Sequence, residues 1–316
     1  MSTNTNIKIK MTSKKTIIVT GASRGIGRGI ALVLSRDEGH IVFATGRSQG
    51  ALEALQKEVE SSTDRGGRVI PCVVDHSNDD STKQLIERAV RETGTLDCLV
   101  NNAYSGVGPI AEHFGLPFWK KPLSVWNASH DVGLRSHYIA SALSIPHMLA
   151  TKKPCLIVNI SSSGGKSYLF DIAYGCGKAA LDRLGCDMAT ELTGTNVTVV
   201  TLWPGGVNTE TTSFPGAESV EFSGRGIAAM LNHSTNTKEK HNGKIIQTIE
   251  LAELYHFTDR DGLLPGSKQQ RRPGRLPGEL RRELETIPPI QWSLTSQLSP
   301  PSNPAMKQFF QKQGKL

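Results

Sequence analysis

The eight residues Thr20-Gly21-Ala22-Ser23-Arg24-Gly25-Ile26-Gly27 decide how this chain of 316 residues is interpreted. The apolar segment Thr16-Ile17-Ile18-Val19 leads into them and predicts a buried strand. From Ile26 onward apolar residues recur at positions i, i+4, i+7 and i+8, which predicts a helix with one face on a sheet. The glycines therefore lie in a strand-to-helix turn. Unpaired N–H groups and the positive end of the helix dipole make such a turn suitable for an anionic group such as a pyrophosphate.

The remainder of the chain alternates apolar, strand-like runs with helical patterns. We predict six further strands, over residues 39–45, 69–74, 96–100, 155–160, 197–202 and 244–249. Continuous apolar runs separated by helices are typical of parallel strands that helices cover on both faces. The predicted fold class is therefore α/β, a Rossmann-type doubly wound parallel sheet of about seven strands in a single domain over residues 15–264.

Three segments fall outside this alternating pattern. Residues 1–14 form a polar leader, residues 210–242 show little periodicity and are predicted to form a substrate flap, and residues 265–316 hold eight of the sixteen prolines. Gln, Ser and Arg accompany these prolines, a composition typical of chains that bury too little apolar surface to fold. We therefore predict a poorly ordered, basic C-terminal extension after the domain.

The formal net charge of +7 is concentrated at the two ends of the chain. From Pro265 onward there are nine Lys and Arg residues against three acidic ones, and the residues up to Lys15 add four lysines and no acid. The predicted domain between them is close to neutral, so no nucleic-acid partner is predicted. A solvated tail is the favoured interpretation, and a weak contact between this tail and an anionic membrane surface is the alternative.

The five cysteines show no paired spacing of the kind that binds zinc, so no metal site is predicted. They are odd in number and mostly have apolar neighbours, which favours reduced, packed thiols. No apolar run reaches the roughly 20 residues of a membrane helix, and the leader lacks the apolar core of a secretory signal. We expect a cytoplasmic protein or, alternatively, one held peripherally on an intracellular membrane.

Residues that suit a ligand site follow the predicted strands one after another. They are Gly21, Arg47, Asp75, Asn101, Ser162 and Thr209. In an open α/β sheet, ligands bind in the crevice beyond the carboxyl ends of the strands. The repetition therefore predicts one ligand site that several strand ends form together.

Tyr174 and Lys178 are four residues apart in a predicted helix and share one face, with their Cβ atoms about 5–6 Å apart. A nearby ammonium group stabilises a phenolate, so we expect Lys178 to lower the pKa of Tyr174 from about 10 toward neutrality. A tyrosine with such a pKa is suited to act as a general acid. Spacing alone is equally compatible with a surface pair. Two serines at the end of the preceding strand, twelve and thirteen residues before Tyr174, favour the catalytic interpretation.

Several motifs occur in the order typical of one large enzyme family. They are Thr20-Gly21-x3-Gly25-x-Gly27, Asn101-Asn102-Ala103, the serines after the strand at 155–160, Tyr174-x3-Lys178 and Pro204-Gly205. In this combination the chain resembles the short-chain dehydrogenases/reductases over about residues 14–264. The resemblance implies an oxidoreductase that transfers a hydride between a nicotinamide cofactor and a carbonyl or alcohol carbon.

The resemblance also implies roles for individual residues. Tyr174 is expected to donate a proton to the substrate carbonyl, Lys178 to bind the nicotinamide ribose, and Ser162 to hydrogen-bond the carbonyl oxygen. Counting from the strand selects Ser162, whereas counting back thirteen residues from Tyr174 selects Ser161, and we favour Ser162. The family's fourth catalytic residue is an asparagine, and this chain has Asp131 there. An ionised aspartate only accepts hydrogen bonds, so Asp131 either orders a water near Lys178 or weakens turnover.

The residues after the second predicted strand indicate the choice of cofactor. An NAD site needs an acid there for the ribose 2′-hydroxyl, but the chain has a glycine followed by Arg47. Arg47 and Arg24 both suit a 2′-phosphate, so we predict NADP(H). Asp75 is expected to accept a hydrogen bond from the adenine, and Asn101 and Thr209 to contact the ribose and nicotinamide ends. The predicted cofactor site comprises Gly21, Ser23, Arg24, Gly25, Ile26, Gly27, Arg47, Asp75, Asn101, Tyr174, Lys178, Pro204, Gly205, Val207 and Thr209.

Two functions from different classes are compatible with these residues. The first is an NADPH-dependent carbonyl reductase or alcohol dehydrogenase, which by the resemblance acts on steroids or other bulky, hydrophobic carbonyls and forms a homo-oligomer. Aromatic residues that either line its pocket or belong to the core are Tyr104, Phe114, Phe118, Trp119 and Trp126. The second is a scaffold or redox sensor that binds NADP(H) and turns over weakly because of Asp131.

Overall fold

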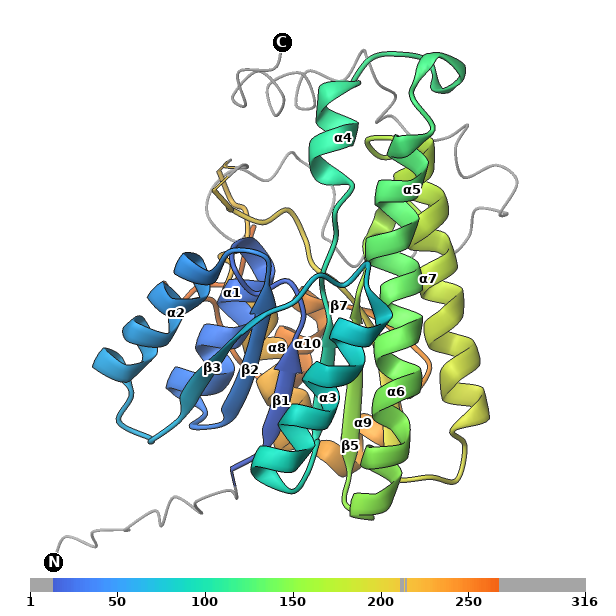
Figure 1. Ribbon diagram of the computed structural model, residues 1–316. Helices are drawn as coiled ribbons and strands as arrows, with labels where there is room; N and C mark the ends of the chain where they lie inside the picture. Colours follow the sequence, from blue (N-terminus) through green and yellow to red (C-terminus); the bar gives the residue numbers. More distant parts are fainter. Residues whose placement is uncertain (1–13, 211–212, 214, 267–316) are drawn as a thin grey trace, which may run out of the picture.

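A single sheet of seven parallel strands forms the centre of the protein, in the order β3-β2-β1-β4-β5-β6-β7 (Figure 1). The computed structural model describes residues 14–210, 213 and 215–266. The strands are β1 (Thr16–Val19), β2 (Ile41–Gly46), β3 (Arg68–Val73), β4 (Cys98–Asn101), β5 (Cys155–Ile160), β6 (Val197–Trp203) and β7 (Ile245–Gln247). The predicted fold class and the number of strands are confirmed.

Helices cover both faces of this sheet. They are α1 (Gly25–Leu32), continued as η1 (Val33–Asp37), α2 (Gln49–Ser62), α3 (Asp79–Thr93), α4 (Val107–Glu112), η2 (Phe118–Lys120), α5 (Ser124–His130), η3 (Asp131–Arg135), α6 (Ser136–Thr151), η4 (Ser163–Gly165), α7 (Ile172–Glu191), α8 (Phe222–Asn232), α9 (Ser234–His241) and α10 (Thr248–Tyr255). In Figure 1, α3 and α6 lie in front of the sheet, whereas α8 and α10 lie behind it.

The alternation of side chains along each strand creates two separate apolar cores. Ile17 and Val19 of β1 face the core that α1, α2 and α8 cover, whereas Ile18 faces the core under α3 and α6. All three side chains are fully buried. Burying one such side chain contributes roughly 1.5–3 kcal/mol, so three successive apolar residues in this strand stabilise both layers.

The order in which the chain adds strands to the sheet reverses at β1, while all seven strands stay parallel. This strand pairs with β2 on one side and with β4 on the other, so the helices after β1 and β4 pass to opposite faces. The departing connections leave a crevice beyond the carboxyl ends of these two strands, which is the usual ligand position in an open α/β sheet. The glycine turn begins directly at the end of β1, where Val19 is followed by Thr20 and Gly21.

Most of the region predicted as a flap over 210–242 is helical. Phe222 of α8 is fully buried, and α8 packs against α1. Gly224 permits this approach, because a Cβ there would lie 2.9 Å from Cβ of Val33. Residues 222–232 and 234–241 are therefore helices, in which glycines that weaken the helical pattern serve close helix packing, and the substrate flap stays a prediction.

Two further segments named in the sequence analysis fall largely outside the described residues. The described part begins at Lys14, so it excludes almost all of the leader over 1–14, and it ends at residue 266, at the start of the extension over 265–316. Within the part of the chain that the structure describes, no helix is both long enough and apolar enough to cross a membrane.

Candidate active site

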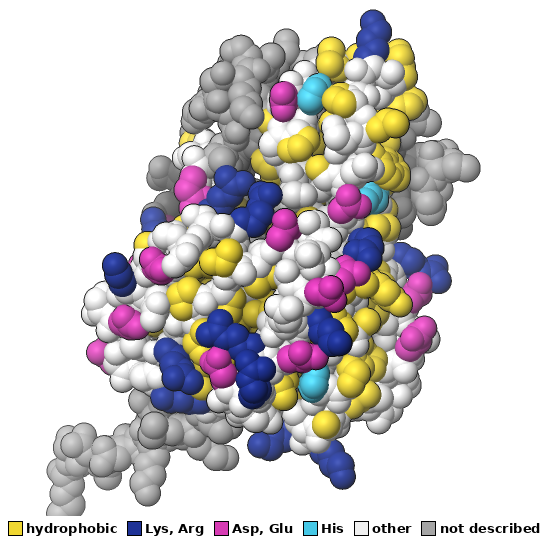
Figure 2. Space-filling model, viewed as in Figure 1, with side chains coloured by type: hydrophobic (Ala, Val, Ile, Leu, Met, Phe, Trp, Pro, Cys, Tyr) yellow, Lys and Arg dark blue, Asp and Glu magenta, His cyan; other side chains and the backbone are white. Residues whose placement is uncertain are grey.

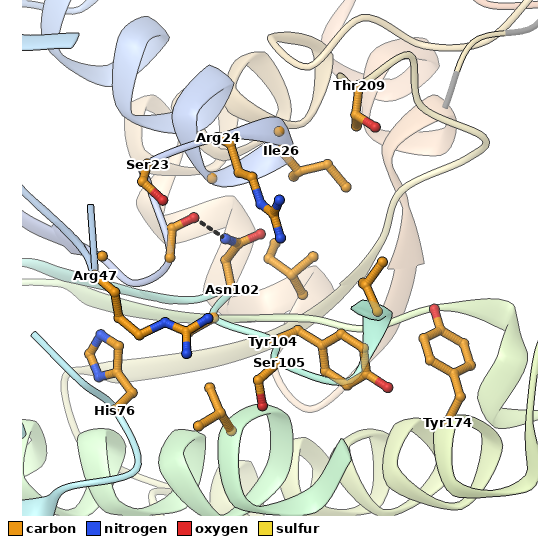
Figure 3. A pocket seen from close by; sticks show the side chains of 18 of the residues that line it. Ser23, Arg24, Ile26, Arg47, His76, Asn102, Tyr104, Ser105, Tyr174 and Thr209 are labelled. Atoms are coloured by element: carbon orange, nitrogen blue, oxygen red, sulfur yellow. Dashed lines mark hydrogen bonds between the residues drawn. The ribbon is translucent and has the colours of Figure 1, made fainter. Parts of the chain in front are cut away.

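A cavity of about 360 Å³ lies at the carboxyl ends of the strands, as expected from the position of the glycine turn (Figure 3). Its volume falls within the usual range for small-molecule sites, about 300–1,000 Å³. Eleven of the predicted cofactor residues line it: Gly21, Ser23, Arg24, Gly25, Ile26, Gly27, Arg47, Asp75, Tyr174, Lys178 and Thr209. The structure thus brings together the glycine turn and the Tyr-Lys pair, which are about 150 residues apart in the sequence.

The glycine turn holds its shape through contacts that exclude larger side chains. Gly21 has a φ of +68°, which favours glycine, and a Cβ at Gly27 would lie 2.3 Å from the carbonyl oxygen of Gly21. The amide of Asn102 donates to the carbonyls of Thr20 and Gly21, at 2.9 and 3.1 Å. Asn102 thereby fixes the turn from the neighbouring strand. The sequence pattern predicts no role for Asn102.

The first helical amide of α1 already binds an anion supplied by the protein. The backbone N–H of Gly25 donates to both carboxylate oxygens of Glu210, at 3.2 and 3.1 Å. Glu210 also lines the cavity. A carboxylate at this position shows that the helix N-terminus attracts negative charge, which is the property that a pyrophosphate requires.

Two cations lie in the same part of the cavity. Arg47 follows Gly46 at the end of β2, where no acid is present, and Arg24 lies in the glycine turn. Figure 3 shows both guanidinium groups directed into the cavity. Planar guanidinium groups bind phosphate through paired hydrogen bonds, so these residues fit a phosphorylated ribose.

Two residues that follow β3 line the cavity: Asp75, which the sequence predicted, and His76, which it did not. Oδ1 of Asp75 accepts hydrogen bonds from the backbone N–H and the hydroxyl of Ser77, which lower the pKa of Asp75. His76 is buried, and its Nε2 lies 2.7 Å from Oγ1 of Thr45. Thr45 Oγ1 in turn accepts from the N–H of Gly21 at 3.3 Å. His76 therefore supports the glycine turn through Thr45, and burial lowers its pKa to about 4.

Tyr174 and Lys178 lie on the face of α7 that borders the cavity. Lys178 Nζ donates to the carbonyl of Ile160 at 2.9 Å and lies 5.8 Å from the centroid of the Tyr174 ring. The Tyr174 ring packs edge-to-face against Tyr104 and Phe170, with centroids 5.7 and 5.2 Å away. The phenol is thus enclosed by aromatic rings next to the ammonium group.

This enclosure changes the expected acidity of the tyrosine. Burial raises the pKa of Tyr174 to about 12, and a hydrogen bond with Ser162 only partly opposes it. Burial also lowers the pKa of Lys178 to about 8. The prediction that Lys178 brings the pKa of Tyr174 toward neutrality is therefore wrong for this structure, because the loss of solvation raises this pKa and the charge of Asp182 raises it further.

The two candidate serines occupy different environments. Ser162 forms a hydrogen bond with Tyr174, and its Oγ also accepts from the N–H of Gly164 at 3.0 Å. Ser161 lines the cavity but turns its hydroxyl toward the carbonyl oxygen of Lys178, 3.4 Å away, and toward Asp182. The geometry favours Ser162 as the partner of Tyr174.

Six predicted site residues lie outside the cavity lining: Asn101, Asp131, Ser162, Pro204, Gly205 and Val207. The side chain of Asn101 is 0% exposed and donates to Asn159 Oδ1 and Ser141 Oγ, both at 2.9 Å. The predicted cofactor contact of this side chain is thus wrong, and Asn102 faces the cavity instead. The side chain of Asp131 is exposed to solvent and lies outside the cavity lining, and its role, whether ordering a water near Lys178 or weakening turnover, stays a prediction.

The expected aromatic pocket contains one of the aromatic residues that the sequence pointed to, Tyr104, and one that it did not, Phe170. Tyr104 and Phe170 line the cavity, whereas Phe118, Trp119 and Trp126 are 60%, 72% and 47% exposed. Figure 2 shows hydrophobic side chains on the surface at the end of the molecule that carries α4 and α5. Phe170 was missed because nothing in its local sequence indicates that the loop before α7 folds over Tyr174.

Known proteins share both the sequence pattern and the fold. Residues 15–218 match the family described as short chain dehydrogenase. The chain therefore belongs to the short-chain dehydrogenase/reductase family, whose members are oxidoreductases that use nicotinamide cofactors. The family predicted from the sequence is confirmed.

Within the family, the chain is 41% identical over 266 residues to Dehydrogenase/reductase SDR family member 1 of Mus musculus, covering 78% of this chain and 83% of that protein. Identity to the Homo sapiens protein of the same name is 39% over equal shares. A short-chain dehydrogenase/reductase from Caenorhabditis elegans, solved with cofactor, is 25% identical, with a TM-score of 0.65 and coverage of 75% of this chain and 94% of that chain. A short chain dehydrogenase from Burkholderia cenocepacia, solved with NADP, shares the fold at 22% identity, with a TM-score of 0.63 and coverage of 74% and 95%.

Proposed function

We propose that the protein is an NADPH-dependent carbonyl reductase or alcohol dehydrogenase. The observation that carries this proposal is the composition of one cavity, which holds the guanidinium groups of Arg24 and Arg47 together with Tyr174 and Lys178. Such a cavity suits a ligand with phosphate groups at one end and a reacting centre at the other. The family supplies the reaction class, and the two arginines supply the preference for a phosphorylated cofactor.

The chain's own residues would bind the substrate and supply the proton that its carbonyl oxygen takes up. A nicotinamide cofactor, when bound, supplies the hydride. Tyr174, whose pKa burial raises to about 12, is protonated at neutral pH and would donate its proton to the carbonyl oxygen. Ser162 would hydrogen-bond the same oxygen as negative charge develops on it. Lys178 would bind the ribose hydroxyls through its ammonium group.

The substrate is proposed to be a hydrophobic ketone or secondary alcohol. Apolar side chains from three separate segments line the cavity beside Tyr174: Tyr104, Val107, Ile110, Val132 and Phe170. Apart from Lys178, the charged side chains in the cavity belong to the glycine turn, to the ends of β2 and β3, and to Glu210. This distribution suits bulky carbonyl compounds without a charge near the reacting carbon, including steroids.

The proposal is tested with purified protein, NADPH and a panel of hydrophobic ketones, by following the consumption of NADPH. We expect oxidation of NADPH that depends on the ketone and disappears in Tyr174→Phe. NADH is expected to bind more weakly than NADPH. Equal affinities for NADH and NADPH contradict the proposed cofactor preference.

A second candidate is a scaffold or redox sensor that binds NADP(H) with little turnover. Two observations favour it: Asp131 replaces the family's asparagine on the exposed side of η3, and burial makes Tyr174 a weak acid. Tight NADPH binding without Tyr174-dependent oxidation across a broad panel would support this candidate and exclude the reductase.

A further inference from the structure

A buried aspartate lies directly behind the Tyr-Lys pair. Asp182 follows Lys178 by one helical turn on α7, so the two side chains share a face, and Asp182 is only 8% exposed. Its Oδ1 accepts a hydrogen bond from Nε1 of Trp203, at 3.0 Å. The hydroxyl of Ser161 also bonds its carboxylate. The ends of β5 and β6 therefore both hold this side chain in place.

The backbone around Asp182 leaves room for a carboxylate. A Cβ at Gly165 would lie 2.7 Å from Oδ2 of Asp182, so a side chain at this position in η4 would displace the acid. Trp203 is buried and ends β6, so its indole N–H has little access to water. A buried indole N–H needs an acceptor, and a buried carboxylate needs donors and an opposite charge.

Asp182 and Lys178 each shift the pKa of the other. Burial raises the pKa of Asp182 to about 6, whereas Lys178, Lys166 and the two hydrogen bonds oppose that increase. In Lys178, burial lowers the pKa and Asp182 raises it. Among the described residues, Asp182 is the acid with this effect on Lys178. The aspartate therefore remains ionised at neutral pH and favours the ammonium form of the lysine.

Other titratable groups face the pair from the surrounding elements. Tyr174 lies on the same helix, and Tyr104 places its ring 5.1 Å from Lys178 Nζ. His137 of α6 is buried and has its own pKa lowered by Lys178. Lys166 lies 5.8 Å from the centroid of the Trp203 ring. Asp182 is the acidic member of this group, which otherwise consists of cations, phenols and a neutral imidazole.

We propose that Asp182 is a positioning residue that keeps Lys178 protonated and directed toward the cavity. This inference rests on the proposed function, in which Lys178 binds the cofactor ribose. Asp182 does not line the cavity, so it acts on a bound ribose through Lys178. Its charge also raises the pKa of Tyr174. Without its charge, the buried ammonium group would lose its proton at a lower pH and would bind the ribose less well.

The test measures NADPH affinity by nicotinamide fluorescence across pH, together with kcat/KM for a ketone that the wild-type protein reduces. In the wild type, affinity falls above the pKa of Lys178, and this dependence is absent in Lys178→Met. In Asp182→Asn, the fall moves to lower pH by about one unit. Asparagine keeps the acceptor for Trp203, so the fold is retained. Trp203→Phe removes one stabilising hydrogen bond from the carboxylate. In this variant the fall in affinity also moves to lower pH, but by less than in Asp182→Asn.

The matched control is Asp187→Asn, which removes an acid from the exposed face of the same helix, where it pairs with Arg183 at 2.8 Å. We expect no shift in this variant. If Asp182→Asn lowers affinity or kcat/KM equally at every pH, or leaves both unchanged, the inference is wrong although the proposed function stands. If the wild-type protein does not bind NADPH, the proposed function fails first and the inference fails with it.

Discussion

The two ends of the cavity are built by different means. The phosphate end consists of the turn over 20–27 and the residues after β2, which are close to one another in sequence and on the same few strands. The tyrosine end collects Tyr174 from α7, Tyr104 from the segment after β4 and Phe170 from the loop before α7. The first end is a local backbone motif, whereas the second depends on long-range packing.

Because the two ends are built differently, we expect them to control different properties of the protein. At the phosphate end, backbone N–H groups and guanidinium groups are held by glycine conformations and strand ends, so their chemistry follows directly from their residue types. At the tyrosine end, the same residue types acquire a different acidity because aromatic rings exclude water from them. Binding preference is therefore expected to respond to charge changes, and catalysis to respond to changes in the enclosure.

The largest expected effect is at the tyrosine end. Tyr174→Phe keeps the ring that packs between Tyr104 and Phe170 but removes the proton donor. We expect kcat/KM for ketone reduction to fall about 10²- to 10⁴-fold, the usual contribution of general acid catalysis, while NADPH affinity is unchanged. Steady-state kinetics and fluorescence titration measure the two quantities. A fall in NADPH affinity of the same size would show that the two ends are not independent.

A change at Gly27 tests the phosphate end as a backbone motif. In Gly27→Ala the added methyl group would lie 2.3 Å from the carbonyl oxygen of Gly21. We expect a loss of roughly 1–3 kcal/mol in the free energy of unfolding, together with a loss of NADPH binding. The control is Gly50→Ala in α2, where an added Cβ meets no atom within 4 Å. Normal NADPH binding by Gly27→Ala would contradict the close packing described above.

A smaller and more selective effect is expected for Arg47→Ala. Removing the guanidinium should weaken NADPH binding about 10- to 100-fold, since a hydrogen bond to a charged group contributes roughly 1.5–3 kcal/mol. NADH, which lacks the 2′-phosphate, should bind as before. Arg91→Ala, on the exposed surface of α3, serves as the control. Unchanged NADPH affinity in Arg47→Ala would leave Arg24 as the cation that selects the phosphate.

The smallest effect concerns the loop after β6. Glu218 is buried, and its Oε1 accepts from the N–H of Gly205 at 3.0 Å. Burial raises its pKa from 4.5 to about 8. The folded state therefore binds this proton more tightly than the unfolded state does, and the contribution to stability is lost as pH rises through this interval.

We expect Glu218→Gln to reduce the pH dependence of thermal unfolding between the ordinary glutamate pKa and about pH 8. Glutamine keeps the acceptor for Gly205 and cannot ionise. Melting curves at several pH values measure the effect, with Glu239→Gln on the exposed side of α9 as the control. Identical pH dependence in Glu218→Gln and the wild type would mean that the buried carboxyl does not limit stability.

The fold and the phosphate end could be predicted because local patterns determine them. Continuous apolar strands, the glycine spacing and the position of Arg47 each depend on a few consecutive residues. The pairing of Tyr174 with Lys178 is equally local, since helical spacing fixes it. Helix α8 was missed because Gly224 and Gly226 interrupt its apolar pattern, although the first of them is needed for packing against α1.

The remaining features depend on contacts between distant segments. Asn101 and Asn102 are adjacent and chemically identical, but one side chain bonds to Asn159 in the core and the other faces the cavity. Sequence spacing could not distinguish them without the register of β4. The raised pKa of Tyr174 likewise requires Phe170 and Tyr104 to enclose the ring, which no local pattern indicates.

The contact between Glu210 and Gly25 has a consequence for how any phosphate reaches the turn. Glu210 belongs to the same chain as the amide that it binds, so its carboxylate competes at an effective concentration set by chain geometry and not by the solution. A phosphate that binds the N–H of Gly25 must displace the carboxylate of Glu210. Occupation of the turn therefore exchanges one anion for another.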